Sequence, residues 1–279
     1  MKTSIKYFLP VLLVSSLVAL SGCTKAKYDD DYVKGNPPPI AGGYVNSREV
    51  AASNLVAYWA FNGSLVDSVS GTAGTNAGTS FSPGFKGQAL QGADSAYALA
   101  TPSDAVKSMT AYTMSFWVNT AQNTGATGIV SLGNTQDFWG NINVFFENGG
   151  TASKARFKTI FEDSGQVNDN GIQDVENGFN NWVQYLITYD GAGTFKSYVN
   201  GSVAAAKTIE GAGPARFINV GPIIFGTLHF MTKPSSTSGS TAQSWAGYLP
   251  GKLDEVRIYN KALTELEVSA LFKLEKQGR

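Results

Sequence analysis

Hydrophobic and polar residues alternate with a period of two along much of the chain from residue 55 onward. In residues 113–118, for example, Met114, Phe116 and Val118 fall on one side of an extended chain and Trp117 falls on the other. Side chains of a β-strand point alternately to its two faces, so this pattern predicts strands. The same pattern predicts strands at residues 55–61, 129–132, 142–146, 182–189, 195–199, 203–207, 218–225 and 253–259.

Residues 181–207 have the pattern of a three-stranded meander. Asp190-Gly191 and Asn200-Gly201 separate the alternating segments. Asn-Gly is a strong signal for a two-residue hairpin, because a type I′ turn needs positive φ at both central residues.

One helix is predicted, and it lies near the C-terminus. Thr264 is placed to cap the N-terminus and Glu267 to complete a capping box, with Leu263 and Val268 at the hydrophobic-staple positions. Its apolar face would then consist of Val268, Leu271 and Phe272. Many short strands and one terminal helix predict an all-β fold, a two-sheet antiparallel β-sandwich with one short C-terminal helix.

The composition narrows the function classes. The formal net charge is zero, so nucleic acid is not an implied partner. With 31 glycines and only 15% charged residues, the chain has the composition of a turn-rich extracytoplasmic β protein. Its one cysteine leaves no partner for an internal disulfide, so the fold must be stable without cross-links.

The first 22 residues are predicted to be a lipoprotein signal peptide. Lys2 and Lys6 precede an apolar run over residues 7–20, which is too short for a membrane-spanning helix. Residues 20–23 (LSGC) resemble the bacterial lipobox, which implies that Cys23 is lipidated and anchors the chain to a membrane. Two or three acyl chains give the stable anchoring that one chain does not. An ordinary signal peptide cut near residue 22 is the alternative.

Residues 23–50 are predicted to be a flexible tether. They contain an acidic run, Asp29 to Asp31, followed by proline-rich and glycine-rich segments that act as spacers. The acidic run resembles the surface-export signal of Bacteroidetes lipoproteins, which implies an outer membrane lipoprotein on the cell surface. A solvated linker is the alternative. The globular domain is then expected to span residues 51–279.

Four motifs resemble the laminin-G-type, concanavalin A-like jelly rolls of bacteria. They occur in family order at residues 55–68 (LVAYWAFNGSLVDS), 83–90 (PGFKGQAL), 113–118 (TMSFWV) and 251–263 (GKLDEVRIYNKAL). The resemblance implies a concanavalin A-like jelly roll. It is far less specific for function, because one fold carries many unrelated activities.

The candidate functions are a glycan-binding module, an adhesion or structural domain that binds another protein, and a glycoside hydrolase. Glucanases with this fold carry two glutamates and one aspartate at E-x-D-x-x-E spacing, and this chain has no such run. Asp174 and Glu176 are two residues apart but lie in a segment with the composition of a loop. A single histidine, His229, argues against a Ser-His-Asp triad. The sequence therefore favours a non-catalytic, carbohydrate-binding module.

Aromatic residues in polar segments are the candidate sugar-binding groups. Trp139 lies in such a segment, where Asp137 and Asn141 could hydrogen-bond sugar hydroxyls. Trp245 and Tyr248 are the second pair of candidates. Core or rim packing is the alternative role for each of these aromatic residues.

The family resemblance also implies a structural calcium ion, with Asn62, Asp67 and Asp254 as ligands. Alternation places Asp254 on the same strand face as Val256 and Ile258. The alternative is that the two aspartates accept hydrogen bonds from backbone N–H groups. Residues 168–171 faintly resemble an EF-hand loop, but the strong carboxylates of that loop's ends are missing, so a solvated loop is expected there.

Overall fold

The computed structural model describes residues 37–163 and 165–279, whose strands form two sheets of eight strands each. Sheet A contains β1 (Leu55–Trp59), β3 (Ser80–Pro83), β4 (Gln88–Gln91), β6 (Tyr112–Asn119), β11 (Val183–Tyr189), β12 (Thr194–Val199), β13 (Ser202–Thr208) and β16 (Lys252–Tyr259). Sheet B contains β2 (Thr75–Ala77), β5 (Tyr97–Ala100), β7 (Ala126–Asn134), β8 (Ile142–Phe146), β9 (Lys154–Asp163), β10 (Gln166–Glu176), β14 (Val220–Phe225) and β15 (Ala246–Gly247).

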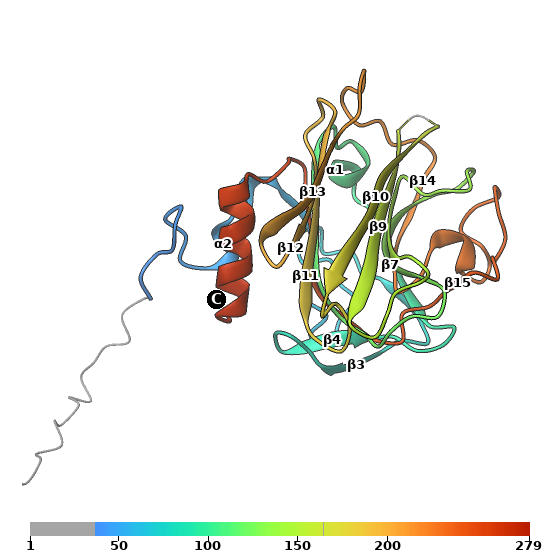
Figure 1. Cartoon of the computed structure of the whole chain (residues 1–279), viewed down its shortest axis with the longest axis horizontal. Helices are drawn as coiled ribbons and strands as arrows, with labels where there is room; N and C mark the ends of the chain where they lie inside the picture. Colours follow the sequence, from blue (N-terminus) through green and yellow to red (C-terminus); the bar gives the residue numbers. More distant parts are fainter. Residues whose placement is uncertain (1–36, 164) are drawn as a thin grey trace, which may run out of the picture. The chain divides into compact units, whose positions relative to one another are not determined.

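The strand order is β13-β12-β11-β6-β16-β4-β3 in sheet A, with β1 also paired to β16. In sheet B it is β10-β9-β8-β7-β14-β5-β2, and β15 adds to β7 as a parallel pair. The helical elements are α1 (Asp104–Lys107), α2 (Glu265–Lys276) and the 3₁₀ turns η1 (Ser47–Glu49), η2 (Ala52–Asn54) and η3 (His229–Met231). The sheets face each other in Figure 1, and α2 lies against the outside of sheet A. The predicted antiparallel sandwich with a C-terminal helix is confirmed.

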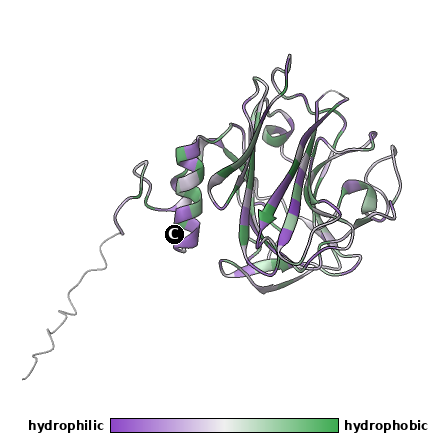
Figure 2. Ribbon diagram, in the orientation of Figure 1, coloured by the Kyte–Doolittle hydropathy of each residue, from purple (hydrophilic) through white to green (hydrophobic). Residues whose placement is uncertain are grey.

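The core lies between the two sheets and follows the predicted alternation. On β6, Met114, Phe116 and Val118 point into it and are fully buried. Trp117 points the other way, to the face that α2 covers, where its ring stacks on Phe272. Figure 2 shows the resulting alternation of hydrophobic and hydrophilic positions along the strands.

The helix α2 forms as its capping signals predict. The Thr264 side chain accepts from the Glu267 backbone N–H, and the Glu267 carboxylate accepts from the Thr264 backbone N–H. Val268 and Leu271 pack with Leu186 and Tyr198 of sheet A in a second apolar cluster. The hairpin prediction also holds, because Asn200 and Gly201 both have positive φ between β12 and β13.

The compact unit that contains the sandwich begins at Pro38. Asn46 caps η1 in a capping box with Glu49, and the Val50 side chain is buried in the α2 cluster. The last part of the segment predicted as tether, residues 38–50, is therefore packed against the domain. The signal peptide, Cys23 and the acidic run lie outside the described residues.

Two β-bulges change the faces expected from alternation. A register shift in β1 turns Leu55 toward the α2 cluster, whereas Ala57 and Trp59 face the core. A second shift in β16, between Asp254 and Arg257, places Asp254 opposite Trp117 on the outer face. Asp254 therefore does not share the core face with Val256, because the extra residue of the bulge inverts the alternation.

The acidic segment expected to be a loop is the edge strand β10. Its residue Asp174 pairs across the ladder with Arg156, and its carboxylate lies 3.6 Å from the Lys154 ammonium. The part that resembles an EF-hand forms a bulge instead. There the Asp169 carboxylate accepts from the Gly171 backbone N–H and pairs with Lys158. A long strand can carry these polar residues because its outer face is solvated and lined with matching cations.

Candidate functional site

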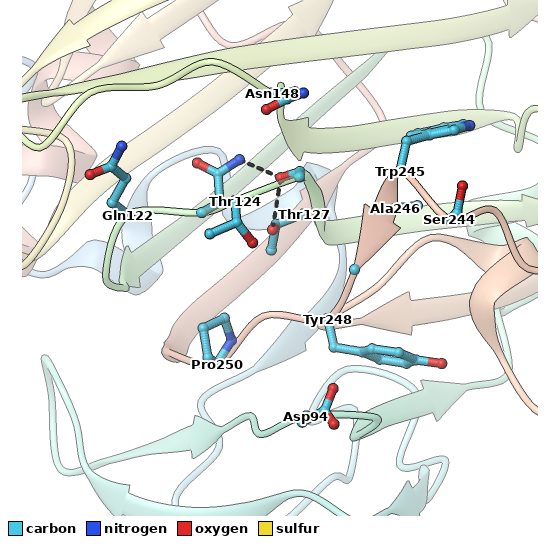
Figure 3. A pocket seen from close by; sticks show the side chains of 13 residues that line it. Asp94, Gln122, Thr124, Thr127, Asn148, Ser244, Trp245, Ala246, Tyr248 and Pro250 are labelled. Atoms are coloured by element: carbon cyan, nitrogen blue, oxygen red, sulfur yellow. Dashed lines mark hydrogen bonds between the residues drawn. The ribbon is translucent and has the colours of Figure 1, made fainter.

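One hollow brings two of the predicted sugar-binding residues together, Trp245 and Tyr248. We refer to it as the Trp245 pocket; it has a volume of about 440 Å³. Figure 3 shows that its labelled lining side chains come from separate segments of the chain. Its lining residues are Asp94, Gln122, Asn123, Thr124, Gly125, Thr127, Asn148, Ser244, Trp245, Ala246, Gly247, Tyr248 and Pro250.

The short parallel pairing of β15 with β7 positions the two aromatic residues. The Ala126 backbone N–H donates to the Trp245 carbonyl at 2.8 Å. A Cβ on Gly125 would lie only 2.7 Å from that carbonyl, so glycine is required where the two backbones approach. At the other end of β15, the Tyr248 hydroxyl donates to the Met231 carbonyl at 2.7 Å. Trp245 is left 39% exposed at the rim of the pocket.

Several polar side chains in the pocket have no protein partner within the described residues. They are the Asp94 carboxylate, the Asn148 amide and the hydroxyls of Thr124 and Ser244, and all four residues are exposed. They offer both donors and acceptors beside an exposed indole ring. The lining contains one carboxylate and no lysine or arginine. The pocket therefore presents hydrogen-bonding groups, and the net charge of its lining side chains is weakly negative.

Trp139 lies beside this pocket rather than in it. Its ring stacks on Phe145 with centroids 5.9 Å apart and lies 6.2 Å from the Trp245 ring. Phe138 and Phe230 complete an aromatic cluster on the outer face of sheet B. Trp139 thus packs beside the Trp245 ring and supports it.

Asn141 and Asp137 are structural residues in this fold. Asn141 is fully buried, and its amide donates to the carbonyls of Gly133 and Ile218 and accepts from the Ile218 backbone N–H. Asp137 accepts from the Asn134 amide at 2.8 Å. The buried Asn141 side chain is out of reach of a sugar hydroxyl, because it satisfies buried backbone groups. Asp137 is half-buried, and for it sugar binding stays a prediction beside its structural role.

Asp137 also contacts the buried carboxyl group of Glu162 on β9. Burial, together with the charge and hydrogen bond of Asp137, raises the pKa of Glu162 to about 7. The His229 Nε2 lies 3.2 Å from the Asp137 carbonyl, and burial lowers the pKa of His229 to about 4. A neutral imidazole beside that carbonyl is a donor that fixes the loop, which fits a packed histidine.

The residues predicted as calcium ligands already serve the backbone. Asp67 uses both carboxylate oxygens, accepting from the backbone N–H groups of Tyr58, Val69 and Ser70 and from the Ser70 hydroxyl. Asp254 accepts from the N–H groups of Lys86 and Glu255. The Asn62 amide oxygen accepts from the Gln88 N–H at 2.7 Å.

These three side chains do not fit a shared calcium site. Calcium needs oxygen lone pairs, and N–H donors occupy those of Asp67. Burial raises the pKa of Asp254 to about 7, against the lowering effect of its N–H donors. The part of the chain that the structure describes holds no group of three or more His, Cys, Asp or Glu arranged for a metal. Calcium binding itself stays a prediction.

Sequence reasoning found the aromatic side of the pocket and missed its polar side. Asp94, Gln122, Asn148 and Ser244 come from four loops that are far apart in the chain. The one available signal was the run of amide and hydroxyl residues at positions 122–124 (QNT).

The fold and the family comparison agree. Residues 91–269 match the family Laminin_G_3, described as the concanavalin A-like lectin/glucanases superfamily, and the chain belongs to this family. Among curated proteins no match is found. No helix in the described residues is long and apolar enough to cross a membrane.

Solved structures with the same fold include two toxin binding domains and one domain of an enzyme. The binding domain of Paraclostridial Mosquitocidal Protein 1 has a TM-score of 0.59 and 18% identity, over 79% of this chain and 52% of that one. The binding domain of botulinum neurotoxin serotype G has a TM-score of 0.57 and 18% identity, over 79% and 51%. This chain thus spans about half the length of both toxin domains.

Domain 4 of AbnA is similar over almost its whole length. AbnA is a GH43 extracellular arabinanase from Geobacillus stearothermophilus, and its domain 4 was solved in complex with arabinotriose. The TM-score is 0.52 and the identity 20%, over 78% of this chain and 98% of that one. At such identities these likenesses show the fold and leave the ligand open.

Proposed function

We propose that the domain binds neutral glycans in the Trp245 pocket and is not catalytic. The observation that carries this proposal is the exposed Trp245 ring beside four polar side chains without protein partners. A sugar ring has an apolar face and a hydroxyl rim, so it is recognised by an aromatic surface together with a few placed donors and acceptors.

The charge of the pocket supports neutral sugars over acidic ones. Asp94 is the one charged side chain in the lining, and a carboxylate or sulfate on the ligand would meet it without a compensating cation. The complex of AbnA domain 4 with arabinotriose makes a neutral pentose oligosaccharide a suitable first probe. The same fold in two toxin binding domains is consistent with a binding role.

The test is calorimetric titration of the domain with arabinotriose and a glycan array of neutral oligosaccharides. Trp245→Ala should weaken binding to the best array ligand at least tenfold, because a tryptophan in contact with the ligand commonly contributes a large share of the binding free energy. Trp245→Phe should restore much of the affinity. Leu266→Ala on α2 removes another exposed apolar side chain, far from the pocket lining, and should leave the affinity unchanged.

Unfolding curves of each variant exclude loss of the fold as the cause. Equal binding by Trp245→Ala and the unmodified domain would refute the pocket. A blank array, together with defective cell attachment in a strain lacking the protein, would favour the adhesion alternative. Turnover of a polysaccharide would overturn the non-catalytic role.

We further propose that a lipid on Cys23 displays the domain on the bacterial surface. The lipobox-like residues 20–23 and the acidic run that follows support this proposal. Labelling cells with an alkyne fatty acid should tag the protein, and Cys23→Ser should abolish the tag. Digestion of the domain by protease added to intact cells tests its outward orientation.

A further inference from the structure

A second hollow of about 430 Å³ lies between the first strand and the bulge of β16. We call it the Arg48–Lys86 hollow, and it shares no lining residue with the Trp245 pocket. Its walls come from η1, β1, the turn after β1, the β3–β4 loop and β16. They are formed by Arg48, Leu55, Tyr58, Ala60, Asn62, Ser68, Val69, Lys86 and Glu255.

The hollow is lined by two cations that have no partner within residues 37–163 and 165–279. Neither the Arg48 guanidinium nor the Lys86 ammonium forms a hydrogen bond or an ion pair there. The Asn62 amide oxygen is engaged by the Gln88 N–H, which leaves its NH₂ group as a further donor. Three side chains therefore direct donor groups into a single concave space.

The only carboxylate in the wall, that of Glu255, is already engaged by protein groups. Glu255 accepts from the Arg257 guanidinium at 2.7 Å, and both of its oxygens accept from the Tyr58 hydroxyl at 2.9 Å. Arg257 also pairs with Glu275 of α2 on its other side. The lining charges that no protein group pairs with are therefore those of Arg48 and Lys86.

The same network fixes the shape of the wall. Glu255 is 1% exposed and has a φ of 51°, an unusual backbone conformation for a buried glutamate. The Arg257 guanidinium lies 4.4 Å from the Tyr58 ring centroid and clamps that ring in place. A wall held in this way loses little conformational freedom when a ligand binds.

The remaining lining is mostly apolar and consists of the Tyr58 ring with Leu55, Ala60 and the 45% exposed Val69. Its one polar side chain, Ser68, donates to the Tyr58 carbonyl. A ligand that fills the hollow must therefore combine a ring-sized apolar surface with an anionic group. A bare inorganic anion would use the cations and leave this apolar surface uncovered. An acidic sugar, such as a uronic acid residue, has both features.

We propose that the Arg48–Lys86 hollow is a second binding site, specific for carboxylate-bearing sugars of acidic polysaccharides. Arg48 and Lys86 bind the carboxylate, the Asn62 amide donates to a hydroxyl, and the sugar ring lies against Tyr58. This site is independent of the Trp245 pocket and does not require that pocket to bind any ligand.

The experiment compares two ligands that differ only in charge. The domain is titrated with oligogalacturonate and with its fully methyl-esterified form, which is neutral. Oligogalacturonate should bind, and methyl esterification should abolish most of the affinity. Arg48→Gln and Lys86→Gln should each weaken binding about fivefold, and the double variant about twentyfold. Lys107→Gln, which removes an exposed cation on α1, serves as the matched control.

Unfolding curves confirm that the glutamine variants are folded, which is expected because both side chains lie at the surface of the hollow. Equal binding of the charged and esterified ligands would overturn the proposal, and so would undiminished binding by the double variant. Binding to vesicles containing anionic lipid, with none to oligogalacturonate, would assign the hollow to a membrane instead. Trp245→Ala should leave oligogalacturonate binding intact. The two proposals can therefore fail independently, because each is tested with its own ligand and its own variants.

Discussion

The Trp245 pocket and the Arg48–Lys86 hollow have nearly equal volumes but opposite chemistry. The first has one carboxylate, no cation and an exposed indole ring. The second has two free cations around a clamped tyrosine ring. Loops build the first, whereas a buried charge network that joins β16 to α2 supports the second. One sandwich thus holds two separate hollows of opposite chemistry, each with its own structural support.

The largest expected effect concerns that charge network. Arg257→Met should lower the free energy of unfolding by about 3–5 kcal/mol, because it leaves the buried carboxylates of Glu255 and Glu275 without their shared partner. Lys158→Met, which removes a more solvated ion pair on sheet B, should cost about 1 kcal/mol or less. Chemical denaturation of both variants measures the difference.

Loss of the charge network should also affect the two proposed binding sites differently. Where Arg257→Met still folds, it should impair oligogalacturonate binding far more than binding in the Trp245 pocket. An Arg257→Met domain as stable as the unmodified one would contradict the supporting role of the network.

An intermediate effect is expected from salt. Raising the sodium chloride concentration from about 50 mM to about 500 mM should weaken oligogalacturonate binding roughly tenfold, because ions screen exposed charges at that concentration. Binding of a neutral oligosaccharide in the Trp245 pocket should change less than twofold. Titrations at the two salt concentrations measure both, and equal salt dependence at the two sites would remove the distinction between them.

The smallest effect is a pH dependence at the Asp137–Glu162 contact, next to the aromatic cluster. The pKa of Glu162 is raised from 4.5 to about 7, so the folded chain holds more protons than the unfolded chain between these values. The free energy of unfolding should therefore fall as the pH rises from about 4.5 to about 7 and should level off above that.

Glu162→Gln should reduce this slope. The loss of unfolding free energy between pH 5 and pH 8 should therefore be smaller in the variant than in the unmodified domain. Urea denaturation at the two pH values measures it, with the exposed Glu210→Gln as control. Asp254, whose pKa burial also raises to about 7, contributes a slope of the same sign and should preserve part of the dependence. An unchanged slope in Glu162→Gln would mean that the carboxyl contact does not control it.

Features that depend on near neighbours in the chain were predicted well. The alternation in residues 113–118, the Asn200-Gly201 turn and the Thr264–Glu267 capping box all occur as expected. Each is decided within a few residues by side-chain direction or by backbone conformation, so the sequence alone carries the information.

The bulges were not predictable in the same way. At Asp254 the alternation fails because one extra residue enters β16, and the pairing with β6 fixes its position. The calcium ligands implied by resemblance illustrate the same limit. Only the structure shows that N–H groups from separate segments already occupy their oxygens.

By itself the sequence determined the fold class, the faces of most strands, the terminal helix and the two aromatic residues of the Trp245 pocket. The tertiary structure decided which polar groups surround those residues, where Asn141 turns inward, and how Arg48 and Lys86 come to flank Tyr58. The physical reason is the distance along the chain between the residues that interact. Secondary structure follows from contacts between near neighbours, whereas both surfaces are built from loops and strand ends that only the closed sandwich brings together.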